Sequence, residues 1–361
     1  MSSILTNSSA MVALQTLKGI NSNLARTQDQ ISTGKAVATA KDNAAVWAIS
    51  KVMESDVQGF KNISDSLSLG QSTVAVARKA SETVTDLLTQ MKGKIVAAQE
   101  QNVDRAKIQT DIDALKKQIG AVVGAAQFNG LNLLSNTDKT AGTGTVSVLS
   151  SLDRSASGVA TGSISVGKRD LGQAAAAITG TAVAAASDRL SGTANGTATA
   201  LAGAATPATT SATIDSVEAG YGYAVAITAG GGSLATGFNT ATATSISYVA
   251  RDGDSAADVA KGLAAAFNKQ VESFIEANPT AAGTSTIRAT ASGGTITFAG
   301  ANSAAADTYS VNVQGYAAAG NTIGGGLAAA GTIDVTTATG AKSALKEIEG
   351  LIQTSVAAAA S

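Results

Sequence analysis

A heptad pattern of apolar residues from Val57 to Ala98 is the feature that most limits the folds open to this chain. One row of the pattern repeats every seventh residue, and a second row follows three residues behind it. The rows are Phe60, Leu67, Val74, Ser81, Leu88 and Ile95, then Ile63, Gly70, Ala77, Val84, Met91 and Ala98. This spacing predicts one long helix with a single apolar stripe, which we call the seam. Because a lone helix with such a stripe is unstable in water, other helices must cover it.

Two further segments have the spacing needed to cover the seam. A helix is expected between residues 103 and 127, joined to the seam helix by a short turn. Another is expected between residues 341 and 360, near the far end of the chain. The positions that define their rows are Ile108, Leu115, Leu345 and Ile352. We therefore predict an antiparallel bundle in which both segments pack on the seam.

A first helix, expected between Ser3 and Ser32, also carries apolar residues seven apart, at Leu17, Leu24 and Ile31. Its companion row contains Asn21 and Gln28. Buried in a seam, these two amides would fix the register at a cost in stability. On an ordinary amphipathic helix they would face water instead, and the sequence leaves both interpretations open.

Composition divides the chain into three parts and indicates an α+β multidomain protein. Residues 1–50 are expected to form an N-terminal helix with a connector. Residues 51–139 together with 335–361 are expected to form a long antiparallel, coiled-coil-like bundle. The part between them, 140–334, is rich in Ala, Gly, Thr and Ser and has the character of an inserted β-rich region.

Strand patterns occur at several places in this inserted region. Val146 and Val148 alternate, as do Ile164 and Val166, and together they predict a strand pair. Residues 172–217 are too low in complexity to assign. From Tyr221 onward, alternating strands, one amphipathic helix and a hairpin predict an α+β module at about 218–316.

Residues suited to catalysis or to metal binding are scarce. The chain contains no histidine and no cysteine, which removes the commonest general base and the commonest zinc ligands. Asp252, Asp254 and Asp258 resemble part of a calcium loop, but N-capping of the following helix accounts for Asp254 and Ser255 without a metal. We therefore expect no enzyme activity, no metal and no cofactor.

The net charge and the apolar runs exclude two further classes of partner. A net charge of −1 gives the chain no overall field to attract nucleic acid. The longest apolar runs are interrupted by Gly, Thr and Ser, so no membrane insertion is expected. The N-terminal residues lack the basic and apolar regions of a Sec signal peptide.

Short motifs around the expected helices closely resemble the signatures of bacterial flagellins, in the style of the alphaproteobacteria. The matching residues near the first connector are Ser32, Gly34, Ala40, Lys41, Asp42, Ala44, Ala45, Ile49 and Ser50, and those after the third helix are Phe128, Asn129 and Gly130. Residues Ile4–Asn7 and Ser343–Ile348 also resemble this family. The chain departs from the family pattern at Gln30 and at Lys35-Ala36, where flagellins usually carry an arginine and Leu-Arg.

The resemblance implies a self-assembling structural subunit of the flagellar filament, with the middle of the chain projecting outward. It implies export in an unfolded state through the flagellar type III channel, without a cleaved Sec signal peptide, to an extracellular flagellum. The implied partners are further copies of the chain, an export chaperone, and the hook-junction and cap proteins. Flagellins usually continue beyond the last residue here, so we expect a missing C-terminal part and no polymerisation of this chain alone.

An alternative function is an adhesin or glycan-binding role for the central module. Its five tyrosines could form an aromatic platform for sugars, or they could support a small core that is poor in other large residues. They are Tyr221, Tyr223, Tyr248, Tyr309 and Tyr316.

Overall fold

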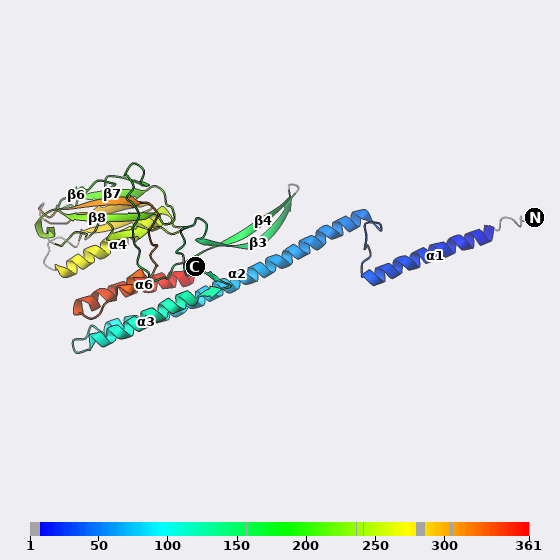
Figure 1. The fold of residues 1–361 in the computed structure, drawn as a ribbon, viewed down its shortest axis with the longest axis horizontal. Coiled ribbons are helices and arrows are strands. Elements are labelled where there is room, and N and C mark those ends of the chain that lie inside the picture. Colours follow the sequence, from blue (N-terminus) through cyan, green and yellow to red (C-terminus); the bar gives the residue numbers. More distant parts are fainter. Residues whose placement is uncertain are drawn as a thin grey trace, which may run out of the picture. The chain divides into compact units, whose positions relative to one another are not determined.

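The fold was described in a computed structural model, which defines residues 8–155, 158–235, 237–240, 242–278, 286–303 and 306–360 (Figure 1). It is an α+β protein with long helices and antiparallel sheets, as expected. The chain divides into two compact units, Met1–Ser68 with Leu149–Ser163, and Leu69–Val148 with Ile164–Ser361. These boundaries cut across the three segments expected from composition. The flagellin-like residues Ile4–Asn7 lie outside the described part.

Two helices account for most of the N-terminal region, α1 at Ser8–Thr33 and α2 at Ala44–Ala97. Gly34 follows α1 with a φ of 65°, a left-handed conformation that glycine adopts without strain. Asn43 caps α2, because its side-chain Oδ1 accepts a hydrogen bond from the Val46 amide at 3.1 Å. Asp42, the preceding residue, instead accepts from the amide and hydroxyl of Thr39, both at 3.0 Å. The connector between α1 and α2 is therefore a hydrogen-bonded turn.

The second unit contains the helical bundle expected from the heptad spacing. Its helices are α3 at Arg105–Ala125, the short α5 at Ala328–Gly331, and α6 at Ala338–Ala360. Asp104 caps α3 by accepting from the Lys107 amide at 3.1 Å. Fully buried residues of α2, α3 and α6 form one apolar cluster; they include Val84, Leu88, Met91, Ile95, Ile112, Ile119 and Ile348. The segments around 103–127 and 341–360 thus pack on the seam, as the spacing predicts.

A small polar contact lies within this bundle. The Ser355 hydroxyl of α6 donates to the Ser81 carbonyl of α2 at 3.1 Å, and the Thr85 and Ser355 hydroxyls are 2.9 Å apart. Ser81 and Ser355 are both completely buried. Buried hydroxyls are stable in a core only when they are hydrogen-bonded, and these are.

Only the C-terminal half of the seam is covered by α3 and α6. From Ala77 to Ala98 its positions are buried, whereas Val74 is 39% exposed and Phe60 is 58% exposed. Leu67 is half-buried. We expected cover along all six heptads. Among the described residues, α6 ends at Ala360, beside Val74 and Ala77.

Two short strand pairs follow the bundle helices. Strands β1, Gln127–Phe128, and β2, Leu131–Asn132, pair across Asn129 and Gly130, whose φ angles are 51° and 80°. The Phe-Asn-Gly motif is therefore a tight turn that requires left-handed backbone. The expected pair at Val146 and Ile164 is also present, as β3 at Thr145–Ser155 and β4 at Gly158–Gly167.

The α+β module of the second unit consists of two four-stranded antiparallel sheets and α4, Ala256–Ala277 (Figure 1). The first sheet has the order β10-β11-β7-β5, at Arg288–Ser292, Thr295–Ala299, Thr209–Ile214 and Leu190–Ser191. The second has the order β6-β12-β8-β9, at Thr199–Leu201, Tyr309–Tyr316, Gly222–Ala229 and Ile246–Val249. A 3₁₀ turn, η1, spans Gly232–Leu234. Side chains from both sheets and from α4 form one apolar cluster.

The module begins earlier than the expected boundary at residue 218. Strands β5, β6 and β7 all lie within 172–217, the segment that could not be assigned from sequence. In β7, Thr210, Ala212 and Ile214 alternate as buried residues with more exposed neighbours. Because threonine and alanine mark buried positions there, the alternation is invisible in a hydropathy pattern.

Substitutions in the covered and uncovered parts of one heptad row should differ in their effect on the stability of the protein. We predict that Leu88→Ala lowers the free energy of unfolding by about 2–5 kcal/mol, because it opens a cavity in a closed core. Val74→Ala, in the same row but 39% exposed, should cost under about 1 kcal/mol. Denaturant unfolding followed by circular dichroism measures both changes, and equal losses would contradict the observed burial.

Candidate assembly interface

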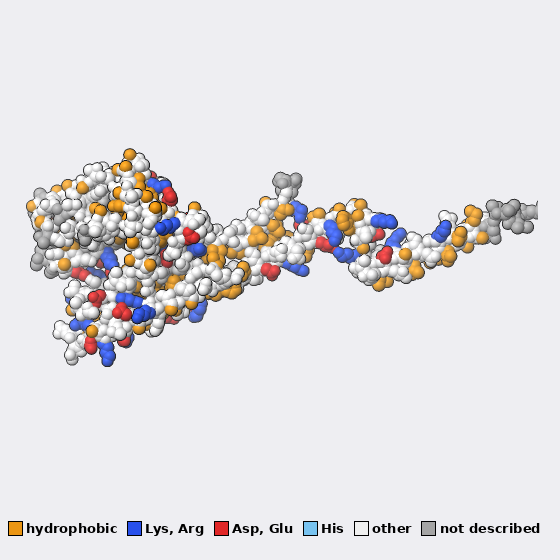
Figure 2. All heavy atoms as spheres, in the orientation of Figure 1, with side chains coloured by type: hydrophobic (Ala, Val, Ile, Leu, Met, Phe, Trp, Pro, Cys, Tyr) orange, Lys and Arg blue, Asp and Glu red, His pale blue; other side chains and the backbone are white. Residues whose placement is uncertain are grey.

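One uncovered apolar surface lies on α1. Every residue of this helix is exposed, and the apolar ones among them colour its surface in Figure 2. Exposed fractions are 55% for Leu14, 56% for Leu17, 54% for Leu24 and 78% for Ile31. These residues are three or seven apart, so they share one face of the helix. Full burial of one such side chain contributes about 1.5–3 kcal/mol, so this stripe favours association.

The N-terminal half of α2 carries a second uncovered apolar surface. Its exposed large residues are Val46, Ile49, Val52, Met53, Val57 and Phe60. Ile49, one of the residues that resemble the flagellin signature, is 61% exposed. Since scattered single apolar residues are normal on protein surfaces, it is the number of these along one helix that marks an interaction surface.

The signature residues near the connector lie together along the chain. Ser32 and Gly34 are at the end of α1, Ala40–Asp42 form the turn, and Ala44–Ser50 open α2. Phe128, Asn129 and Gly130 belong to the second unit, in the turn between β1 and β2. The two signature groups thus have separate local roles, as a connector and as a turn.

Glu54 joins the connector to α2. Its carboxylate binds the Lys35 ammonium, and its other oxygen lies 2.8 Å from the ammonium of Lys51. The hydrogen bond from Lys35, followed by that from Lys51, lowers the pKa of Glu54 to about 2. Lys35 is a position at which the chain departs from the usual flagellin pattern. No sequence pattern indicates this pair, because its members are 19 residues apart.

The tip half of the β3–β4 hairpin packs on α2 within the first unit. The Arg154 guanidinium lies 2.6 Å from Asp56 Oδ1. At Gly59, a Cβ atom would lie 2.6 Å from Leu152 Cδ1, which is closer than such atoms approach. Gly59 therefore permits the close approach of Leu152.

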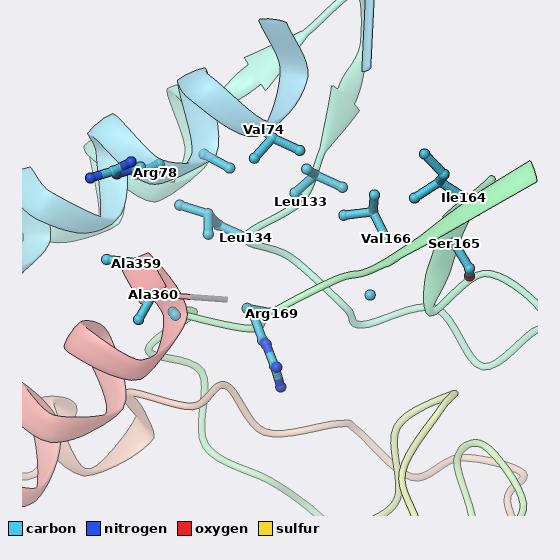
Figure 3. Close-up of a pocket in the computed structure, with 13 residues that line it drawn as sticks. Val74, Arg78, Leu133, Leu134, Ile164, Ser165, Val166, Arg169, Ala359 and Ala360 are labelled. Atoms are coloured by element: carbon cyan, nitrogen blue, oxygen red, sulfur yellow. The ribbon is translucent and has the colours of Figure 1, made fainter. Parts of the chain in front are cut away.

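An apolar groove of about 470 Å³ lies at the end of α6 (Figure 3). Its walls come from α2, from the loop after β2, from β4 and from α6. The labelled residues include Val74, Leu133, Leu134, Val166 and Ala359, with Arg78 and Arg169 as the charged members. The groove therefore adjoins the point where the cover of the seam ends.

The aspartates considered as calcium ligands all have other hydrogen-bond partners. Asp252 accepts from the Gly144 amide at 2.6 Å, and Asp254 accepts from the Tyr248 hydroxyl at 2.8 Å. Asp258 and Ser255 form the capping box of α4. Ser255 is thus the helix cap, whereas Asp254, expected to share that role, binds Tyr248 instead. Within the described ranges, no cluster of three acidic side chains is arranged to hold a metal ion.

The tyrosines of the module are mainly core residues. Tyr223 and Tyr309 are completely buried, Tyr221 and Tyr316 are at most 9% exposed, and Tyr248 packs against the same cluster. The hydroxyl of Tyr221 donates to the Asp188 carbonyl at 2.9 Å, and burial raises the pKa of Tyr221 to about 12. These rings support the core and do not form an exposed platform.

The Lys35–Glu54 pair provides a test of the connector geometry. We predict that Lys35→Met raises the pKa of Glu54 from about 2 toward its ordinary value of 4.5, because the largest cause of the shift is removed. A carboxyl whose pKa is lowered in the folded state stabilises the fold at every pH above its unfolded-state pKa. The contribution of Glu54 to stability is therefore lost as the pH falls from about 4.5 to about 2.

Carbon-detected NMR titration of the Glu54 carboxyl measures this pKa directly. Lys41→Met, which removes a nearby ammonium that makes no ion pair with Glu54 in the described structure, is the control. An unchanged titration of Glu54 in Lys35→Met would show that Lys35 does not bind this carboxylate.

The helices of the described chain include none that is long and apolar enough to cross a membrane. A comparison with solved structures finds the flagellar junction protein FlgL from Legionella pneumophila, at a TM-score of 0.34 and 10% identity over 86% of this chain and 95% of that one. A similarity of this degree carries no argument about function.

Sequence comparisons are more specific. Residues 4–139 match the family described as the bacterial flagellin N-terminal helical region. Flagellin C of Rhizobium meliloti (strain 1021) is 45% identical over 161 residues, 45% of this chain and 50% of that protein. Flagellin FljK of Caulobacter vibrioides is 43% identical over 136 residues, 37% of this chain and 50% of that protein. The chain thus spans about half the length of these relatives, and its N-terminal helical region is similar to that of the alphaproteobacterial flagellins.

Proposed function

We propose that this protein is a structural subunit of the bacterial flagellar filament. The observation that carries the proposal is the exposed apolar stripe of α1, which lies inside the region that matches flagellins. A helix of 26 residues with every residue exposed has no cover from the described chain. Removing an apolar stripe from water by contact with another surface lowers the free energy, so the exposed stripe of α1 supports assembly.

The surface of α2 extends the proposed interface. Its exposed residues from Val46 to Phe60 offer a second helical face to neighbouring subunits. The row-defining residues from Leu88 onward serve a different purpose, because they are buried in the bundle core of the same chain or pack against it. We propose that α1 and the first half of α2 contact other subunits, while the bundle gives each subunit its rigidity.

The remaining partners follow from the same family relationship. We propose export through the flagellar type III channel with a chaperone, contact with hook-junction and cap proteins at the filament ends, and an extracellular location. The role is mechanical and contributes to motility, without enzymatic chemistry. A glycan-binding role has no comparable support, since the tyrosines that suggested it are buried or pack against the module core.

A substitution in the α1 stripe should separate assembly from folding. We predict that Leu24→Ser reduces incorporation of the chain into filaments by about tenfold or more, because it places a hydroxyl in a contact that must become apolar. Lys18→Ser, on the same exposed helix but at a charged position, should leave incorporation nearly unchanged.

Incorporation is measured by sedimentation after adding the labelled protein to filament seeds sheared from the source cells. Thermal unfolding of the bundle should be the same in both variants, because α1 has no buried residue. Normal incorporation of Leu24→Ser would remove the main support for the proposal.

A further inference from the structure

The second unit contains two apolar cores that share no residue among those described. One belongs to the bundle of α2, α3 and α6, and the other to the sheets and α4 of the module. Apolar packing within each core therefore does not determine how the module is oriented on the bundle. The contacts between them must be sought among polar and charged groups.

The most buried of these contacts is centred on Arg251, which follows β9. Its Nε donates to Asp170 Oδ2 at 3.3 Å, and the two side chains are only 17% and 2% exposed. Asp170 precedes Leu171, a member of the bundle core. The other guanidinium nitrogens donate to the Gly324 carbonyl and to the Tyr248 hydroxyl. Arg251 thus links a module residue, Tyr248, to the segment anchored in the bundle.

The next residue, Asp252, strengthens the same junction. Its carbonyl accepts from the Asn136 amide group at 3.0 Å, and its carboxylate accepts from the Gly144 amide at 2.6 Å. The chain also approaches so closely that a Cβ at Gly144 would lie 2.1 Å from the Asp252 carbonyl oxygen. This position therefore requires glycine. Asn136 follows Leu134 of the bundle core by two residues, so the contact again joins module to bundle.

Two partly exposed ion pairs connect α4 of the module with α6 of the bundle. Lys269 lies 2.7 Å from Glu347, and Lys346 lies 3.4 Å from Glu276. The positive residue of one pair and the negative residue of the other belong to the same helix. Each helix therefore contributes one lysine and one glutamate. This arrangement favours one placement of α4 on α6, since sliding one helix along the other brings like charges together.

The covalent connection between module and bundle is narrow. The entering and leaving segments pair at Ala177 and Thr322, and the Asn321 side chain accepts from the amides of Thr179 and Gly180. Its amide group donates to the carbonyls of Gly220 and Ala317. These two adjacent segments form a neck about which the module can pivot on the bundle. A second attachment is therefore needed to fix the orientation of the module.

We infer that Arg251, with Asp170, Asp252 and the two α4–α6 ion pairs, forms a charged clamp that fixes the orientation of the α+β module on the helical bundle. Buried ion pairs contribute little net stability, but they can specify one arrangement because any other leaves a charge unpaired. Release of the clamp leaves the neck as the main attachment and lets the module change its angle. The inference does not depend on the proposed filament role.

The absence of cysteine in the chain makes the clamp directly testable with two engineered labels. Cysteines at the exposed positions Lys117 on α3 and Ser292 on β10 place one spin label on the bundle and one on the module. Pulsed electron–electron double resonance then gives the distribution of distances between the two spin labels. The variant is Arg251→Met, and Arg189→Met, which removes an exposed pair with Glu218 inside the module, is the control.

We expect a narrow distribution in the parent protein and in Arg189→Met, and one at least about twice as wide in Arg251→Met. Raising the salt from about 0.05 M to about 1 M should broaden Arg251→Met further, because salt weakens the α4–α6 ion pairs and leaves only the Asp252 hydrogen bonds of the clamp. The parent should change little with salt, since its central pair is buried.

Two more variants keep the test decisive if Arg251→Met folds poorly. Asp170→Asn removes the partner charge with little change of shape, and Gly144→Ala disturbs the Asp252 contact by steric overlap alone. Both should broaden the distribution while the circular dichroism of the two cores persists. An unchanged narrow distribution in the folded variants, at both salt concentrations, would overturn the clamp.

Discussion

The packing of α3 and α6 against the C-terminal half of α2 is the contact on which the second unit depends. Six heptads of apolar residues require cover along about 60 Å of helix, and one chain supplies it for only part of that length. Where cover exists, Leu88 and Ile95 are completely buried; where it does not, Phe60 is more than half exposed. The same repeat thus stabilises the bundle at one end and leaves an apolar surface at the other.

This division explains which parts of the fold could be predicted from sequence. Helices follow from period alone, so the spacing predicts α3 and α6 with nearly correct bounds. It also predicts the C-terminal end of α2, but this helix begins at Ala44, well before the heptad pattern starts at Val57. Whether a given turn of a helix is covered depends on what else reaches it. Leu88 and Phe60 are equivalent in the repeat, and only the three-dimensional structure distinguishes them.

The strands show a different limit. In β8, large residues such as Tyr223 and Val225 alternate with small ones, so the pattern is visible. In β7, the buried residues include Thr210 and Ala212, and the sequence around them contains the same residue types in exposed positions. Local motifs and long-range contacts also differ in how far the sequence predicts them. The connector motif was recognisable, whereas the Glu54 and Arg251 contacts join residues far apart in sequence and became visible only in the fold.

A seam rich in small residues also needs something to fix its register. Near the end of α6, Ala358, Ala359 and Ala360 offer nearly equal packing after a shift of one turn, so apolar contact alone discriminates weakly there. The buried hydroxyl of Ser355 removes this freedom. It donates to the Ser81 carbonyl and bonds with Thr85 in one register only, and a shifted α6 would leave it buried without a partner. The acceptor is the backbone carbonyl of Ser81, whose own hydroxyl donates to the Ala77 carbonyl within α2. It is therefore the Ser355 hydroxyl of α6, and not the side chain at the polar position of the α2 row, that specifies how the helices align.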